Sequence, residues 1–163
     1  MINKYKQKGA ETVEFAMIAL LFFAVLFAII EFGRALFVWN ALTEATRRGS
    51  RMAVICPYQS PIPAKVAIFD VIAGSLGSSP IIGGLTPAMV NVRYLNQAGV
   101  VEADQSLIKH VEVSIIGYSH QFIIPLWGIS VTAPAFTTTL PTESLGAIPT
   151  YPGDPVKAPD CNF

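Results

Sequence analysis

Residues that build catalytic and metal sites are scarce in this sequence. Its 163 residues include two cysteines and two histidines, and charged side chains make up only 13%. No G-x-S-x-G segment, phosphate-binding glycine loop or paired-cysteine zinc spacing occurs. His110 and His120 lie ten positions apart with Glu112 and Asp104 nearby, a spacing too loose to favour a metal site. We therefore expect no enzymatic activity, no cofactor and no bound metal.

An excess of charge of either sign is also lacking. The formal net charge is zero, with +3 over residues 1–53 and −3 over the remainder. Neither part has the strongly basic balance of a nucleic-acid-binding protein, so we expect no nucleic-acid partner. The length leaves room for one modest domain beside any membrane segment.

Polar side chains are missing altogether from one stretch near the N-terminus. Residues 15–30 are sixteen consecutive residues without a charged or hydrogen-bonding side chain, and no Gly or Pro interrupts them. Crossing a hydrocarbon core of about 30 Å takes roughly 20 residues of helix, a length available between Lys8 and Arg34. The sequence predicts a single transmembrane helix over about residues 12–33.

The charges that flank the apolar run bear on its orientation. Lys4, Lys6 and Lys8 precede it without an acid, which favours a cytoplasmic N-terminus. Three cations beyond the run weaken that preference: Arg34, Arg47 and Arg48. The small-x-small cleavage site of a secretory signal is not evident after the run, so we expect the apolar helix to stay in the mature protein.

The helical pattern continues past the apolar run. A polar stripe at helical spacing faces an apolar stripe, and Pro57 then interrupts the pattern. The polar stripe consists of Asn40, Glu44, Arg47, Arg48 and Arg51, and the apolar stripe of Ala35, Val38, Leu42, Ala45, Gly49 and Met52. A helix over residues 11–53 would be about 64 Å long, so its outer half must bury one face on a domain.

The rest of the chain predicts a small domain and a tail. Apolar residues repeat at helical spacing over residues 61–76, and strand patterns follow at 90–94, 111–115 and 129–140. Pro134 argues for an edge position or a bulge in the third strand segment. We expect an α+β fold with a long helix over residues 10–54, a domain over 55–140 with a small antiparallel sheet and one short extra helix, and an irregular proline-rich tail over 141–163.

Cys56 and Cys161 both lie beyond the apolar run, on the exported side under this topology. An oxidising compartment permits a disulfide between them. Their sequence positions do not fix the geometry, so two unpaired thiols, or thiols bonded between molecules, stay open.

The residues at the start of the helix form the most informative motif. A basic leader over residues 1–9 ends at Gly9-Ala10, and Glu14-Phe15 follows at the mouth of the apolar run. This arrangement resembles a prepilin processing site, which implies cleavage after Gly9 and leaves Glu14 as the fifth residue of the mature chain. The alternative is that Glu11 and Glu14 are ordinary acids of a helix first turn, stabilised by the helix dipole.

A longer match supports the processing interpretation. The segments GAETVEFAMIALLFF and IIEFGRALFVWNALTEATRRGSRMAVI resemble the TadE-like family of pseudopilins from tight-adherence, Flp-type pilus systems. The resemblance covers roughly residues 9–54, and the pair Arg47-Arg48 is a minor departure from the family pattern.

The resemblance implies a fold, a location and partners. It implies a pilin-like fold and a single-pass protein of the bacterial inner membrane, with a cytoplasmic N-terminus and a periplasmic C-terminal domain. It also implies a minor pilin or pseudopilin, processed by prepilin peptidase, that acts in assembly or initiation of the pilus, entering the fibre or only priming it. The implied partners are prepilin peptidase, other pilin subunits, the pilus assembly machinery and the lipid bilayer. In pilins the carboxylate at the position of Glu14 pairs with the N-terminal amine of a neighbouring subunit.

Several residues keep two interpretations. Glu31 and Arg34 are i, i+3 neighbours, either an ion pair that stabilises the helix where it leaves the bilayer or a contact between subunits. Arg47, Arg48 and Arg51 form a solvated face or bind phospholipid or an acidic partner. Residues 122–128, FIIPLWG, pack between strands or form a binding or membrane-touching loop.

Two other classes of function compete with the pilin hypothesis. One is an unprocessed, single-pass anchored periplasmic module that binds a ligand or an envelope protein. The other is a membrane-tethered enzyme, which the scarcity of catalytic residues disfavours.

Overall fold

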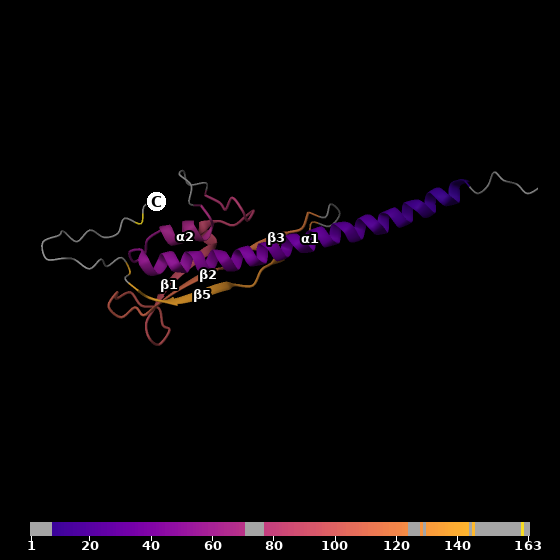
Figure 1. Ribbon diagram of the computed structural model, residues 1–163. Coiled ribbons are helices and arrows are strands. Elements are labelled where there is room, and N and C mark those ends of the chain that lie inside the picture. The colour runs from indigo at the N-terminus through magenta and orange to yellow at the C-terminus, as the bar shows by residue number, and fades with distance from the viewer. Residues whose placement is uncertain are drawn as a thin grey trace, which may run out of the picture.

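One long helix dominates the molecule and carries a small domain on its C-terminal half (Figure 1). The computed structural model describes residues 8–70, 77–123, 128, 130–143, 145 and 161. Helix α1, Lys8–Ile55, has 48 residues and contains no proline. It ends just before Pro57, whose ring cannot continue a helix. The expected long helix is confirmed.

A second helix packs against the C-terminal end of α1. Helix α2, Ile62–Ala67, is shorter than the predicted 61–76 segment. The backbone N–H of Phe69 donates to Val66 O and that of Asp70 to Lys65 O, and Phe69 has φ 63°. This is the Schellman arrangement that closes a helix, with a phenylalanine where glycine is usual. The predicted residues 71–76 lie outside the described part of the chain.

Three antiparallel strands form the main sheet in the order β1-β2-β5. Their bounds are β1 Val90–Leu95, β2 His110–Ile115 and β5 Phe136–Pro141, and a single 3-10 turn, η1 Pro87–Met89, precedes β1. The sequence predicted strands at the first two places. The third predicted segment is divided, because Pro134 lies between β5 and a separate strand, β4 Ser130–Thr132.

A separate two-stranded sheet lies at the end of the domain nearest the exposed N-terminal half of α1 (Figure 1); the sequence predicted neither β3 nor its pairing with β4. Strand β3, Ser119–Gln121, pairs antiparallel with β4, Ser130–Thr132, so that His120 faces Val131 in register. Each strand is only three residues long, too short for a period-2 pattern to be visible in the sequence.

The core lies between α1 and the main sheet and has two clusters ordered along the helix. The first joins Val38, Leu42 and Ala45 to Ile115 and Tyr118. The second lies farther from the N-terminus and consists of Ala53, Val54, Tyr94, Ile108, Val111 and Val113. The apolar stripe predicted on the outer half of α1 is the face that packs on the domain, so the α+β arrangement of long helix, small antiparallel sheet and short helix is confirmed.

Gly49 allows the closest approach of α1 to the domain. A Cβ added there would lie 2.9 Å from Ala67 Cβ, 3.1 Å from Val113 Cγ1 and 3.3 Å from Pro63 O. Because real Cβ atoms are almost never nearer than 3.0 Å to another heavy atom, no larger residue fits without movement of α2 or β2.

Candidate functional site

The motif at the start of α1 is open to solvent. Gly9, Ala10 and Glu14 are all exposed, and a Cβ added to Gly9 would meet nothing within 4 Å. Glu11 and Glu14 lie in the first two turns, where the partial positive charge of the helix end favours acids. No side chain that the structure describes forms an ion pair with Glu14.

The described part of the domain buries no residue of the apolar run of α1. The most apolar window of the helix has a mean hydropathy of 2.8 and is 0% buried, so its side chains need a cover other than this chain's own domain. Length and composition make α1 the one helix of the described residues able to cross a membrane, which is consistent with single-pass anchoring.

Glu31 is the first residue of α1 that the domain buries. It is 6% exposed, whereas Ile30 and Phe32 on either side are 58% and 66% exposed. Its Oε1 accepts a hydrogen bond from the backbone N–H of Ile123 at 3.3 Å. The carboxylate therefore ties the helix to the segment that follows β3.

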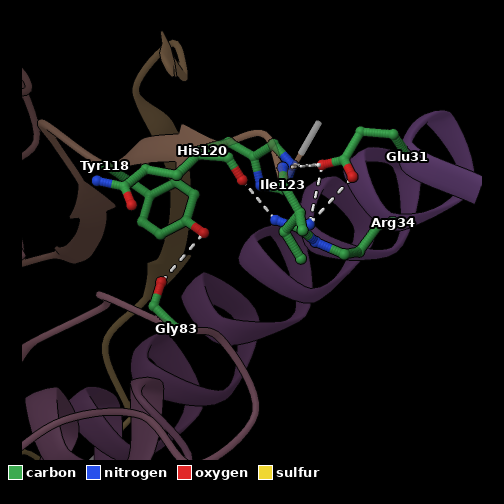
Figure 2. Close-up of polar contacts among 7 residues, drawn as sticks. Glu31, Arg34, Gly83, Tyr118, His120 and Ile123 are labelled. Atoms are coloured by element: carbon green, nitrogen blue, oxygen red, sulfur yellow. Dashed lines mark hydrogen bonds and ion pairs between the residues drawn. The ribbon is translucent and has the colours of Figure 1, made fainter. Parts of the chain in front are cut away.

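Arg34 completes this junction from the next turn of the helix. Its Nη1 lies 2.9 Å from Glu31 Oε1, and its Nη2 donates to the backbone carbonyl of Gln121. Figure 2 shows Glu31 and Arg34 on α1 facing the β3 segment. The predicted ion pair is therefore present, and both of its side chains also bond to backbone groups of their own domain.

His120 lies against the same carboxylate. Its Nε2 is 3.7 Å from Glu31 Oε1, beyond hydrogen-bond range, and it is a buried atom without a hydrogen-bond partner in the described part of the chain. The ring packs edge-on against Phe122 with centroids 5.1 Å apart.

A cleft of about 630 Å³ opens beside the junction, between α1, the loop at residues 81–84 and β3. Arg34, Phe37 and Ile123 contribute to its wall. Tyr118 lines it too and donates its hydroxyl to Gly83 O at 3.3 Å (Figure 2). Burial raises the pKa of Tyr118, and the nearby charge of Arg34 acts in the opposite direction.

The comparison with known families falls on the helix that carries these residues. A family model described as TadE-like protein matches residues 9–51. This segment is TadE-like. The match covers about a quarter of the chain and confirms the resemblance seen in the sequence. No curated protein and no solved structure matches the chain.

The TadE-like segment contains the α1 residues of the start motif, the apolar run and the Glu31–Arg34 junction. It begins at Gly9, includes Glu14, Glu31 and Arg34, and ends two residues after the close contact at Gly49. The partners of Glu31 and Arg34, which are backbone groups of β3 and the residues after it, lie outside the segment. Sequence reasoning missed these partners because a backbone amide or carbonyl leaves no mark in a sequence.

The outer arginines of the TadE-like segment are exposed. Arg48 pairs with Glu44 at 3.0 Å, and its guanidinium carbon lies 4.9 Å from the centroid of the Phe69 ring. Arg47 and Arg51 are also exposed. Such a solvated face agrees with the simpler of the two interpretations.

The structure joins Cys56 and Cys161 in a disulfide with the Cα atoms 5.8 Å apart. Cys56 follows the last turn of α1 and is fully buried. The bond would fix Cys161 to the residue that follows the C-terminal end of α1.

The structure also bears on two other interpretations of the sequence, those of residues 122–128 and of the two histidines. Residues 122–128 had two interpretations, packing between strands or a binding or membrane-touching loop. Half-buried Phe122 agrees with the first and Ile123, which is 70% exposed, with the second; residues 124–127 lie outside the described part. His110 begins β2 and His120 lies in β3, and the described residues contain no group of three or more His, Cys, Asp or Glu able to hold a metal.

Proposed function

We propose that this chain is a minor pilin or pseudopilin that prepilin peptidase processes and that acts in assembly or initiation of a tight-adherence, Flp-type pilus. The observation that carries the proposal is the TadE-like segment, which begins at Gly9 and places Glu14 at the start of an exposed apolar helix. The chain performs no chemistry of its own and acts through contacts with other subunits and the assembly machinery.

The start of α1 suits a processing site. Cleavage after Gly9 would remove the nine-residue leader with its three lysines and leave Ala10 as the new N-terminus. Gly9 and Ala10 are exposed and lie in the first turn of the helix, where the backbone N–H groups lack helical partners and the turn opens at little cost. An enzyme at the cytoplasmic membrane face can therefore reach the bond.

Glu14 suits a role in assembly. A carboxylate at the edge of an apolar segment costs free energy, up to about 3 kcal/mol at the centre of a bilayer, unless it finds a partner. The N-terminal amine of a neighbouring processed subunit is a partner of opposite charge, and their attraction strengthens where water is excluded. In this proposal the pair sets the register between helices of adjacent subunits.

The topology follows from the same helix. The lysines of the leader stay in the cytoplasm, α1 crosses the inner membrane once, and the domain lies in the periplasm. An oxidising periplasm would also favour the Cys56–Cys161 disulfide.

The intact mass of the protein from native-host membranes tests the proposal. We expect the mature chain to begin at Ala10 in cells that contain active prepilin peptidase, and to begin at Met1 when the peptidase gene is deleted or Gly9 is replaced by Val. Gly33→Ala is the matched control, because it alters another unhindered glycine of the same helix and should leave processing intact. A chain that keeps Met1 beside an active peptidase would instead favour the unprocessed, anchored binding module.

A further inference from the structure

One end of the domain faces the exposed N-terminal half of α1. This end is apolar and carries no formal charge. Apart from Glu31 and Arg34, which pair with each other, α1 carries no charged residue between Glu14 and Glu44. Residues 71–92 and 113–142 contain no Asp, Glu, Lys or Arg. The described parts of these stretches include β3, β4 and the ends of β1, β2 and β5 nearest the junction.

Large apolar side chains are exposed at this end, which we call the rim. The rim consists of Phe32, Leu36, Phe37 and Trp39 on α1, with Ile81, Ile116, Ile123 and Val131 on the domain, all between 49% and 70% exposed. Soluble surfaces carry single exposed apolar residues, but a charge-free group of this size marks a surface that something covers.

When α1 crosses a bilayer, the length of the helix determines where the rim lies relative to the membrane. From Glu14 to Arg34 the helix rises about 30 Å, the thickness of a hydrocarbon core. When Glu14 lies at one edge of the core, Arg34 lies at the other. Arg34 donates to the Gln121 carbonyl, and the Ile123 amide donates to Glu31. Ile123 therefore lies beside Glu31 (Figure 2), and its side chain is near the same boundary.

We infer that the rim of the domain is seated in the interfacial layer of the same bilayer that α1 crosses. This inference rests on the anchoring part of the proposed function but not on processing or pilus assembly. The occupant is the lipid surface because the rim is continuous with the membrane-spanning face of α1, lacks the charges that water would favour, and carries Trp39, a residue enriched at membrane interfaces. The Glu31–Arg34 pair then serves a second purpose, since it presents the helix to lipid without an unpaired charge.

The opposite, distal end of the domain lies far from the apolar run of α1 and carries charged side chains. The second core cluster packs on Ala53, about 33 Å farther along the helix axis than Glu31. Arg93, Glu112, Glu102, Asp104 and Lys109 lie on the strands and loops of that end. Leu107 is exposed there to a degree similar to the rim residues, so it offers a matched control position.

Tryptophan quenching by brominated lipid tests the placement in the full chain. The background variant replaces Trp39 and Trp127 with Phe, and a single Trp is then introduced as Ile123→Trp at the rim, Leu107→Trp at the distal end or Phe22→Trp in the span. Each protein is reconstituted in phosphatidylcholine vesicles with bromines at shallow or deep chain positions. We expect loss of emission at 123 with shallow bromines, at 22 with deep bromines, and none at 107.

The outcomes separate the inference from the function on which it rests. If 22 is quenched and 123 behaves like 107, the rim is not in the membrane and the inference is wrong. If 22 is not quenched either, the anchoring itself fails. Emission at 123 that shifts to the blue as the protein-to-lipid ratio rises, without bromine quenching, would show a second copy on the rim and would also overturn the inference.

Discussion

At the scale of single residues, Gly49 sets how closely α1 can lie against the domain. A Cβ there meets Ala67 and Val113, so Gly49→Ala should lower the free energy of unfolding by about 1–3 kcal/mol through overpacking. The higher helix propensity of alanine offsets at most about 1 kcal/mol of this loss. Urea unfolding in detergent micelles measures the change.

The control for this substitution is Gly33→Ala on the same helix. A Cβ at Gly33 meets nothing within 4 Å, so only the gain in propensity remains and stability should hold or rise. Equal gains at both positions would show that α1 does not pack on the domain as described.

Glu31 tests the junction in the same way. Glu31→Gln leaves the guanidinium of Arg34 without its counter-charge against the domain, and should cost about 1–3 kcal/mol of unfolding free energy. Hydrogen exchange at the Ile123 amide should also quicken, because that group donates to the carboxylate. Glu44→Gln is the matched control, since its pair with Arg48 is exposed and should be worth less than about 1 kcal/mol.

The raised pKa values of two buried tyrosines should make the free energy of unfolding depend on pH in the alkaline range. Burial raises the pKa of Tyr94, and its close neighbour Tyr58 adds to the effect, while a hydrogen bond from Gln59 N–H to the Tyr94 hydroxyl opposes it. Burial raises the pKa of Tyr118 as well. A pKa raised in the folded state gives stability that is present below the ordinary tyrosine pKa of about 10 and falls as pH rises through that range.

Unfolding free energies measured across that pH range check the prediction. The wild type should lose stability as the pH rises, and Tyr94→Phe should weaken this dependence while lowering stability at neutral pH. A pH dependence that Tyr94→Phe leaves unchanged would mean that other groups cause the loss.

At the scale of elements, the disulfide fixes residues near the C-terminus to the end of α1. It closes a sequence separation of 105 residues, so replacing both cysteines with serine should lower stability by about 2–4 kcal/mol. Reduction of the wild type should lower stability by a similar amount. Alkylation of the denatured, unreduced protein should label no thiol, whereas two labelled thiols would contradict the bond.

The sequence predicted elements whose pattern is long and local. α1 was evident because apolar residues and then an amphipathic stripe continue without a break to Pro57, and β1 and β2 show alternation over most of their length. The second helix was predicted too long because the periodicity continues past Ala67, whereas the chain turns at Phe69 with a positive φ that a phenylalanine rarely adopts.

The sequence predicted the local ion pair of the candidate site but not its contacts with distant segments of the chain. Glu31 and Arg34 are neighbours on one helix, so their pairing follows from spacing. Their contacts with Gln121 and Ile123 join residues about ninety positions apart through backbone groups. Such contacts depend on where β3 lies in the fold, which no local pattern records.

At the scale of the whole molecule, the chain is divided along α1 by polarity. The N-terminal half of α1 extends beyond the domain (Figure 1) and its apolar window is not buried. The uncharged rim follows, and the charged residues of the domain lie toward the distal end. The domain therefore leaves the first part of the helix available to lipid or to the helices of other subunits. This separation suits the proposed role of the chain as a membrane-anchored pilin subunit.

The number of pili per cell tests the central claim most directly. In a native-host strain that lacks this gene, the wild-type chain and Glu11→Gln should restore Flp-type pili to the same level, while Glu14→Gln should leave the cells with few or none. Glu11 is the control because it is also an exposed acid, one turn earlier in α1. Full piliation of the deletion strain, or of cells with Glu14→Gln, would contradict the assembly role proposed for this protein.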